Sequence, residues 1–188
     1  MVQSNTAHGR RGWRAALVLS VALAAISAAT LAGASPALGE SNGGVGPTPT
    51  APGATAQLLP NGDAVAPEQA PKKVVEAIEA ANEINDLPYK WGGGHSSWKL
   101  DKGYDCSGSV SYMLHGAGVL RKSPLDSGSL ANWGSKGKGQ WITVYANGGH
   151  AYAVVAGLRW DTSGGAGPRW HEDMRSSKGF RIRHFKGL

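Results

Sequence analysis

The sequence predicts an α+β fold in which helices come first and an antiparallel β-sheet follows. Apolar residues recur at helical spacing over residues 72–85 and again over 109–117. Later in the chain, β-branched and aromatic residues alternate over 141–145 and 150–155, on either side of the turn signal Asn147-Gly148. These two patterns place the helical half before the sheet.

The first 34 residues have the composition of an export signal. Three arginines precede a run of small and apolar residues at 15–31, and Ala32-Gly33-Ala34 offers a cleavage site. The alternative is an uncleaved membrane anchor, but the run is rich in alanine and serine and short for a membrane span. We therefore expect residues 1–34 to be removed, which leaves a secreted monomer with no stable membrane association.

The mature chain is expected to be weakly basic. Removal of the signal takes away three arginines and no acidic residue, so the formal net charge falls from +6 to +3. Such a balance suits an anionic surface, and bacterial wall polymers are one candidate. No DNA- or RNA-binding motif accompanies the charge, so nucleic acid is not expected as a partner.

The exported part divides into a linker and one domain. Residues 35–67 are rich in Gly, Pro, Ala and Thr with almost no large apolar side chains, so we expect a flexible tether. Residues 68–188 then form a single catalytic domain, and about 120 residues suffice for one compact core.

Three helices are expected in this domain. The first spans 72–85 and is closed off by Pro88. The second covers 109–117, and a short third one covers 126–133, with Asp126 or Ser127 as N-cap and Gly134 as the stop. The strands at 141–145 and 150–155 are expected to form a hairpin. A third strand at 158–162, a loop at 163–168 and a final strand at 180–185 complete the sheet.

Cys106 is the candidate nucleophile. It is the only cysteine of the chain, and it lies at or just before the start of the second helix, where free N–H groups and the positive end of the helix dipole stabilise a thiolate. The alternative is a small buried apolar side chain. Its setting in Asp105-Cys106-Ser107-Gly108 is polar and glycine-containing, which favours a partly open reactive site in an exported protein.

A cysteine nucleophile needs a general base, and that base needs an orienting group. His150 begins a strand whose backbone would hold it rigidly, whereas the alternative base, His95, lies in a glycine-rich loop. Asp161 could orient His150, because a short strand and a reversal return the chain beside its start. Alternatively, Asp161 caps the turn that follows it.

The residues ahead of Cys106 are candidates for contacts with the substrate. The Tyr89 hydroxyl could stabilise an oxyanion together with the backbone N–H groups of Cys106 and Ser107. The alternative is that Tyr89 and Trp91 are core aromatics. No ligand set for a metal and no phosphate-binding motif is present, so neither a metal nor another cofactor is expected.

These motifs resemble those of the NlpC-type cell-wall cysteine peptidases. The resemblance rests on Pro-Tyr-Lys-Trp-Gly-Gly at 88–93, Tyr-Asp-Cys-Ser-Gly at 104–108, the helix that follows, and Gly-Gly-His at 148–150. It implies a reduced papain-like fold, with N-terminal helices packed on an antiparallel sheet. By position it assigns the nucleophile to Cys106, the base to His150, the supporting tyrosine to Tyr89 and the third catalytic member to Asp161.

The resemblance also implies the reaction. A secreted endopeptidase of this kind cuts the stem peptides of peptidoglycan, typically between D-glutamate and the diamino acid, through a thioester acyl-enzyme. Trp91, Asp105 and Ser107 are then expected to contact the substrate. Two alternatives stay open at this point: an acyltransferase or amidase that uses the same Cys-His site, and a non-catalytic wall-binding protein.

Overall fold

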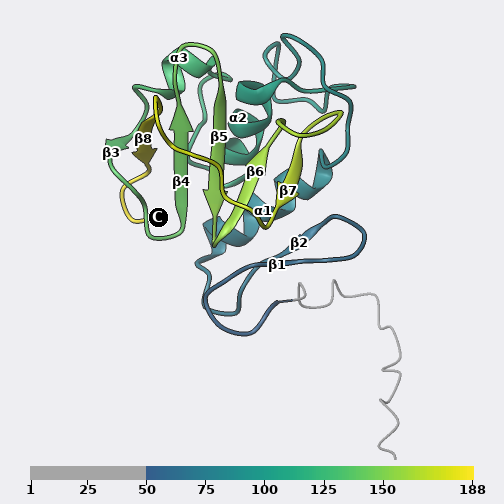
Figure 1. Cartoon of the computed structure of the whole chain (residues 1–188), viewed down its shortest axis with the longest axis vertical. Helices are drawn as coiled ribbons and strands as arrows, with labels where there is room; N and C mark the ends of the chain where they lie inside the picture. The colour runs from purple at the N-terminus through teal and green to yellow at the C-terminus, as the bar shows by residue number, and fades with distance from the viewer. Residues whose placement is uncertain (1–49) are drawn as a thin grey trace, which may run out of the picture. The chain divides into compact units, whose positions relative to one another are not determined.

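A computed structural model describes residues 50–188 of the chain (Figure 1). The expected signal at 1–34 and the first part of the expected linker, up to residue 49, lie outside the described residues. Among residues 50–188, no helix is long and apolar enough to cross a membrane.

The described part of the chain has the expected α+β composition, with a six-stranded antiparallel sheet as its largest element. The sheet order is β3-β8-β4-β5-β6-β7, and a separate hairpin, β1-β2, precedes the helices. The strands of the sheet are β3 (Ser135–Lys136), β4 (Ile142–Ala146), β5 (Ala151–Val155), β6 (Leu158–Asp161), β7 (Arg169–His171) and β8 (Arg181–His184). Every pairing between neighbouring strands is antiparallel.

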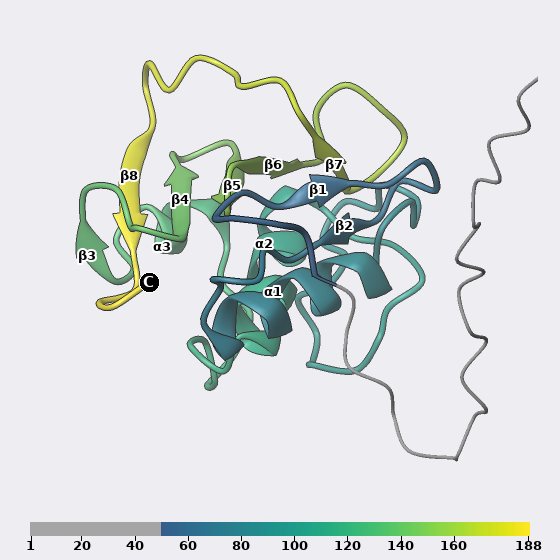
Figure 2. The ribbon, with the colours of Figure 1, turned by 90° about the horizontal axis from the view of Figure 1, so that it is seen from below.

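Two helices cover one face of this sheet. Helix α1 (Lys72–Glu83) packs against α2 (Cys106–Gly116), which in turn contacts β5 and β6, whereas the short α3 (Ser127–Leu130) lies beside β4. Figure 2 shows α1 and α2 on the same side of the sheet. Alternate residues of β4 and β5 point toward the helices, and the core they share contains Ile78, Met113, Val144, Val155 and Trp160. This packing fixes the start of α2 relative to the sheet.

The expected linker extends too far along the sequence. Residues 51–67 belong to the folded unit and include β1 (Gln57–Leu58) and β2 (Ala64–Val65). Small side chains, among them Ala56 and Ala64, are buried there, so the segment needs no large apolar residues. Its backbone is attached by hydrogen bonds: the Asn82 side chain donates to the Ala64 carbonyl (2.8 Å) and accepts from the Ala64 N–H (3.0 Å).

The last part of the chain crosses the face of the sheet opposite to α1 and α2. We call residues 172–180, which connect β7 to β8, the C-terminal strap. Figure 2 shows this yellow segment on the far side of the sheet from the helices. The strand β7, which sequence periodicity did not predict, pairs with β6 and leads into the strap. The predicted strand at 180–185 corresponds to β8, which pairs with β4.

Candidate active site

The sequence around Cys106 forms a helix start, with Cys106 as the first residue of α2. Asp105 is its N-cap: the Oδ1 atom accepts a hydrogen bond from the N–H of Gly108 (2.7 Å), and the Asp105 carbonyl accepts one from the N–H of Ser109 (3.0 Å). Within residues 50–188, the N–H groups of Cys106 and Ser107 have no such acceptor, as expected for the first positions of a helix. They remain available to an anion that forms near the thiol.

The glycine-rich loop packs directly against this helix start. The Gly93 carbonyl accepts a hydrogen bond from the N–H of Asp105 (3.3 Å), and the Asp105 side chain accepts one from the N–H of Gly92 (3.1 Å). A Cβ atom on Gly108 would come within 2.1 Å of the Gly93 oxygen, so only glycine allows this approach. The loop thereby holds both the cap and the cysteine.

The turn between β4 and β5 positions His150. Sequence analysis placed His150 at the first position of a strand, but β5 begins at Ala151, because Ala146 pairs with Ala151 and four residues form the turn. The Asn147 side chain accepts hydrogen bonds from the backbone N–H groups of Gly149 (2.9 Å) and His150 (3.0 Å). This side-chain cap fixes the backbone at the histidine.

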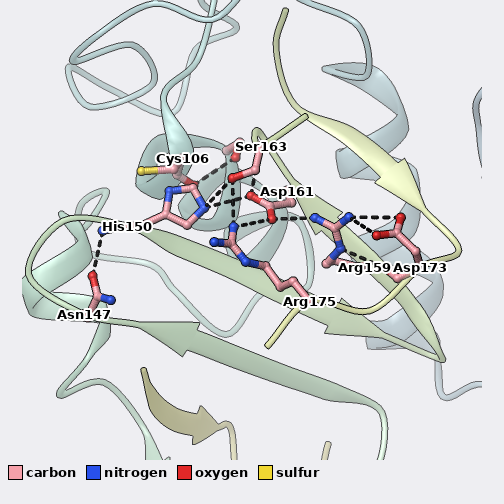
Figure 3. Close-up of polar contacts among 9 residues, drawn as sticks. Cys106, Asn147, His150, Arg159, Asp161, Ser163, Asp173 and Arg175 are labelled. Atoms are coloured by element: carbon pink, nitrogen blue, oxygen red, sulfur yellow. Dashed lines mark hydrogen bonds and ion pairs between the residues drawn. The ribbon is translucent and has the colours of Figure 1, made fainter. Parts of the chain in front are cut away.

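Cys106, His150 and Asp161 come together at this turn, although they are distant in sequence. The Nε2 atom of His150 lies 2.8 Å from Oδ1 of Asp161. The thiol of Cys106 interacts with the same imidazole. Nε2 is engaged by the carboxylate, which leaves Nδ1 as the ring nitrogen for the sulfur. Figure 3 shows the His150 ring between Cys106 and Asp161.

The electrostatics of this group favour a charged cysteine and a charged histidine. Burial raises the pKa of the Cys106 thiol, but hydrogen bonds from His150 and the Ala151 N–H outweigh it, so the thiol pKa lies below its ordinary value. Burial lowers the pKa of His150, but its interactions with Asp161 and Cys106 raise it to about 9. A thiolate beside an imidazolium is the nucleophilic form of such a pair.

Asp161 is buried and has partners other than His150. Its Oδ1 atom also accepts a hydrogen bond from the N–H of Ser163 (3.0 Å), so it caps the following turn while contacting the histidine. Its Oδ2 atom accepts from Arg159 (2.7 Å) and Arg175 (2.9 Å). Burial would raise the pKa of Asp161, but the hydrogen bonds from His150, Ser163 and Arg175 lower it well below its ordinary value. The carboxylate is therefore ionised.

The alternative base, His95, lies near the cysteine but has other partners. Its Nε2 atom lies 2.9 Å from Oδ1 of Asp105 and 3.2 Å from Oγ of Ser107. The hydrogen bond to Asp105 raises the pKa of His95, despite partial burial that lowers it. His150, in contrast, interacts with the thiol itself. Of the two histidines, His150 has the geometry expected of a base for Cys106.

A groove of about 400 Å³ opens beside the thiol. Its lining includes three residues predicted to contact substrate, Trp91, Asp105 and Ser107, together with Cys106. Trp91 is 86% exposed, which contradicts the interpretation of Trp91 as a core aromatic. Tyr89 is 43% exposed and is close enough to Cys106 for the thiolate to raise the tyrosine pKa, after the larger effect of partial burial. Both aromatics are thus available on the surface.

Sequence reasoning missed four residues around the histidine: Asn147 as a cap, and Arg159, Ser163 and Arg175 as neighbours of Asp161. Asn147 had been recognised as a turn residue but not as a cap. Arg159 had a signal as a neighbour of Asp161, because residues two apart on a strand share a face. Arg175 is brought in by the C-terminal strap, whose path no local pattern predicts. Within residues 50–188, no group of three or more His, Cys, Asp or Glu side chains is placed to hold a metal ion.

Among known proteins, matches to the chain come from solved structures. No protein-family model matches the chain. No curated protein matches it either. Among solved structures, the chain is similar to the peptidoglycan hydrolase RipB from Mycobacterium tuberculosis, with 23% sequence identity and a TM-score of 0.48 over 62% of this chain and 68% of that one.

Proposed function

We propose that the chain is a secreted peptidoglycan hydrolase with a reduced papain-like fold, a cysteine endopeptidase that cleaves the stem peptides of the cell wall. The observation that carries the proposal is the contact of the Cys106 thiol with His150, whose other ring nitrogen bonds to the buried Asp161. The motifs at 88–93, 104–108 and 148–150 resemble those of the NlpC-type cell-wall peptidases, and this resemblance supports peptidoglycan stem peptides as the substrate and the bond between D-glutamate and the diamino acid as the one that is cleaved.

The reaction begins with the thiolate–imidazolium pair. The sulfur of Cys106 attacks the carbonyl carbon of the scissile amide, which forms a C–S bond and moves an electron pair onto the carbonyl oxygen. The tetrahedral intermediate collapses, the C–N bond breaks, and His150 gives its proton to the leaving amine. A thioester remains on the enzyme. Water then attacks it while His150 takes up the proton, and the C–S bond breaks to release the carboxylic acid and the thiolate.

Groups at the helix start would stabilise the oxyanion. The N–H groups of Cys106 and Ser107 are the donors, and the Tyr89 hydroxyl adds a third. Burial and the charges of Cys106 and Asp105 raise the pKa of Tyr89, so its hydroxyl keeps its proton at neutral pH and can donate. Trp91 and Asp105 in the groove would contact the peptide.

The same geometry argues against a purely binding role. A wall-binding protein has no need for a thiol with a lowered pKa beside an imidazole with a raised one, since perturbed pairs of this kind are typical of reactive sites. The weak positive charge expected of the mature chain would favour its approach to anionic wall polymers.

Digestion of purified sacculi tests the proposal. The chain without residues 1–34 should release soluble muropeptides, and mass spectrometry should find hydrolysed stem peptides. Cys106→Ala and His150→Ala should each lose release by at least about 1,000-fold. His184→Ala is the matched control, because His184 lies on β8 with its ring against the Gly137 carbonyl and should retain activity.

Two outcomes would contradict the proposal. Release of muropeptides by Cys106→Ala would exclude the thiol as nucleophile. Products that carry a new amide bond in place of a free carboxylate would show acyl transfer, because an amine rather than water would have resolved the thioester.

A further inference from the structure

Arg175 reaches the candidate active site from the C-terminal strap. One atom of its guanidinium, Nη1, donates to Oδ2 of Asp161 (2.9 Å) and to Oγ of Ser163 (2.8 Å) (Figure 3). Its side chain is about one-third exposed, so the contact is made at the boundary between the core and solvent. The strap also contacts the surroundings of His150 through Asp173, which binds Arg159, and through the Gly179 carbonyl, which accepts from Asn147, but Arg175 is the strap residue that binds Asp161 itself.

The guanidinium is also held by aromatic rings. Its central carbon lies 5.1 Å from the ring centroid of Tyr152 and 5.4 Å from that of Phe180. A cation over an aromatic face is stabilised by the ring quadrupole. Tyr152 lies on β5, two residues after His150, so the ring that supports Arg175 is fixed by the strand that follows the histidine.

Arg175 contacts both acceptors that face the histidine. The Nε2 atom of His150 lies 2.8 Å from Asp161 Oδ1 and 3.3 Å from Ser163 Oγ. By binding the other carboxylate oxygen and donating to the hydroxyl, Arg175 turns a lone pair of each acceptor toward the imidazole N–H. Arg159 does not do the same, because its hydrogen bonds within the described residues go to Asp161 and Asp173, whereas Arg175 also donates to Ser163.

We propose that Arg175 is a positioning residue: it fixes Asp161 and Ser163 as a joint acceptor for His150 and thereby makes the reactivity of Cys106 depend on the C-terminal strap. The role given to His150 rests on the proposed function. The strap is thus part of the active site's support.

The charges around the thiol predict in which direction the pKa of Cys106 changes when Arg175 is removed. On the helix and loop side of the thiol lie Asp105 and Tyr89. On the sheet side lie the residues around the imidazole: His150, Asp161, Ser163, Arg159 and Arg175. Asp173 and His171 lie beyond Arg159. Removal of Arg175 takes away a positive charge and loosens the acceptors of the imidazolium. Both effects destabilise the thiolate, so the thiol of the variant should titrate at higher pH.

The cavity beside Arg175 permits a rescue experiment. An open pocket of about 370 Å³ is lined by Arg175, Tyr152 and Met174, among others. Truncation to alanine would leave the space between Tyr152 and Asp161 accessible from this pocket. A guanidinium ion has the charge and the planar donors of the missing side chain and should bind there.

The experiment follows alkylation of Cys106 by iodoacetamide across pH, which reports a single thiol because the chain has no other cysteine. Arg175→Ala should raise the midpoint by roughly half to one pH unit. Millimolar guanidinium chloride, far below denaturing concentrations, should return it toward the wild-type value. Arg181→Ala is the control, because it removes the same charge from β8, where Arg181 contacts Asn132 instead.

The alkylation profile and the melting temperature together distinguish a positioning role of Arg175 from a role in fold stability alone. An alkylation profile for Arg175→Ala equal to wild type, whether or not the melting temperature falls, would overturn the proposal. If Arg175→Ala lacks a cooperative unfolding transition, Arg175→Gln decides, since it keeps a side chain over Tyr152 without the charge; an unchanged midpoint there overturns the proposal as well.

Failure of the proposed function would look different. On sacculi, Arg175→Ala should lower kcat on the order of 10- to 100-fold with little change in KM, because it misplaces His150 without touching substrate. If wild type releases nothing from sacculi, the substrate assignment fails. The alkylation profile still tests Arg175 in that case.

Discussion

Replacing Asp161 with asparagine tests the central contact of the site. The side chain accepts hydrogen bonds on both oxygens: from His150 and Ser163 on Oδ1, and from Arg159 and Arg175 on Oδ2. An amide has only one oxygen, so in either orientation its NH₂ group faces two N–H donors. Asparagine cannot satisfy this site.

The cost can be worked out from this geometry. Asp161 is 1% exposed, so its loss leaves the charges of Arg159 and Arg175 without their shared buried partner. Breaking a buried ion pair in this way costs about 3–5 kcal/mol of unfolding free energy. Asp173→Asn is the matched control, because it also removes a carboxylate charge that is paired with Arg159. The Asp173 side chain is 75% exposed, and exposed ion pairs contribute about 0–1 kcal/mol to stability.

Urea unfolding, followed by tryptophan fluorescence at pH 6, should give this difference. The pKa of Asp161 is lowered on folding, so its contribution is present above the unfolded value of about 3.9 and is lost as pH falls toward the folded value. The pKa of His150 is raised, so its contribution is present below about 6.5 and is lost as pH rises through about 9. The gap between wild type and Asp161→Asn should therefore be largest between about pH 4 and 6.5. A cost equal to that of Asp173→Asn, or a gap that widens below pH 4, would refute the reasoning.

Three further substitutions probe the supports of the site. His150→Gln should move the alkylation midpoint of Cys106 upward, because burial then raises the thiol pKa without the opposing imidazole; an unchanged pH profile would remove His150 from the thiol's surroundings. Gly108→Ala should lower stability by about 1–3 kcal/mol, because its methyl group would meet a backbone oxygen, whereas Gly148→Ala, with nothing within 4 Å of the added Cβ, should be nearly neutral by thermal denaturation. Asn82→Ala should speed hydrogen exchange at residues 51–67 while exchange in β4 and β5 stays slow, and uniform protection would show that other contacts hold this segment.

The helices and the main strands were predictable because their side chains carry the periodicity of the elements that they form. Asp105 is an N-cap type one residue before α2, and the alternation at 141–145 and 150–155 matches β4 and β5. The position of Cys106 at a helix start follows from those local signals. The proximity of His150 and Asp161 was also predictable, because His150 directly precedes β5, Asp161 ends the adjacent antiparallel strand β6, and the connection between the two strands is short.

The remaining features depend on contacts between distant segments. Residues 51–67 contain few large apolar side chains, and they are attached to the fold by hydrogen bonds between their backbone and the Asn82 side chain. Amino-acid composition does not predict such bonds. Arg175 is 14 residues from Asp161 and reaches it only because the C-terminal strap returns over the sheet. His150 was the preferred base from the sequence, because a strand start holds a side chain more rigidly than the glycine-rich loop of His95. In the structure His95 pairs with Asp105, whereas His150 interacts with the thiol.

The contact between Cys106 and His150 has a consequence for the timing of proton transfer. Under the proposed function, acylation converts the sulfur into a neutral thioester, and the imidazole loses one of the two partners that raise its pKa to about 9 in the resting protein. The pKa of the imidazolium therefore falls as the amine departs. The ring that holds the proton before attack becomes a stronger acid during acylation and gives that proton to the leaving amine. The same ring is then neutral when water arrives, which is the form that deacylation requires. A single contact, made and broken by the covalent step itself, would thus set the protonation state for each half of the cycle.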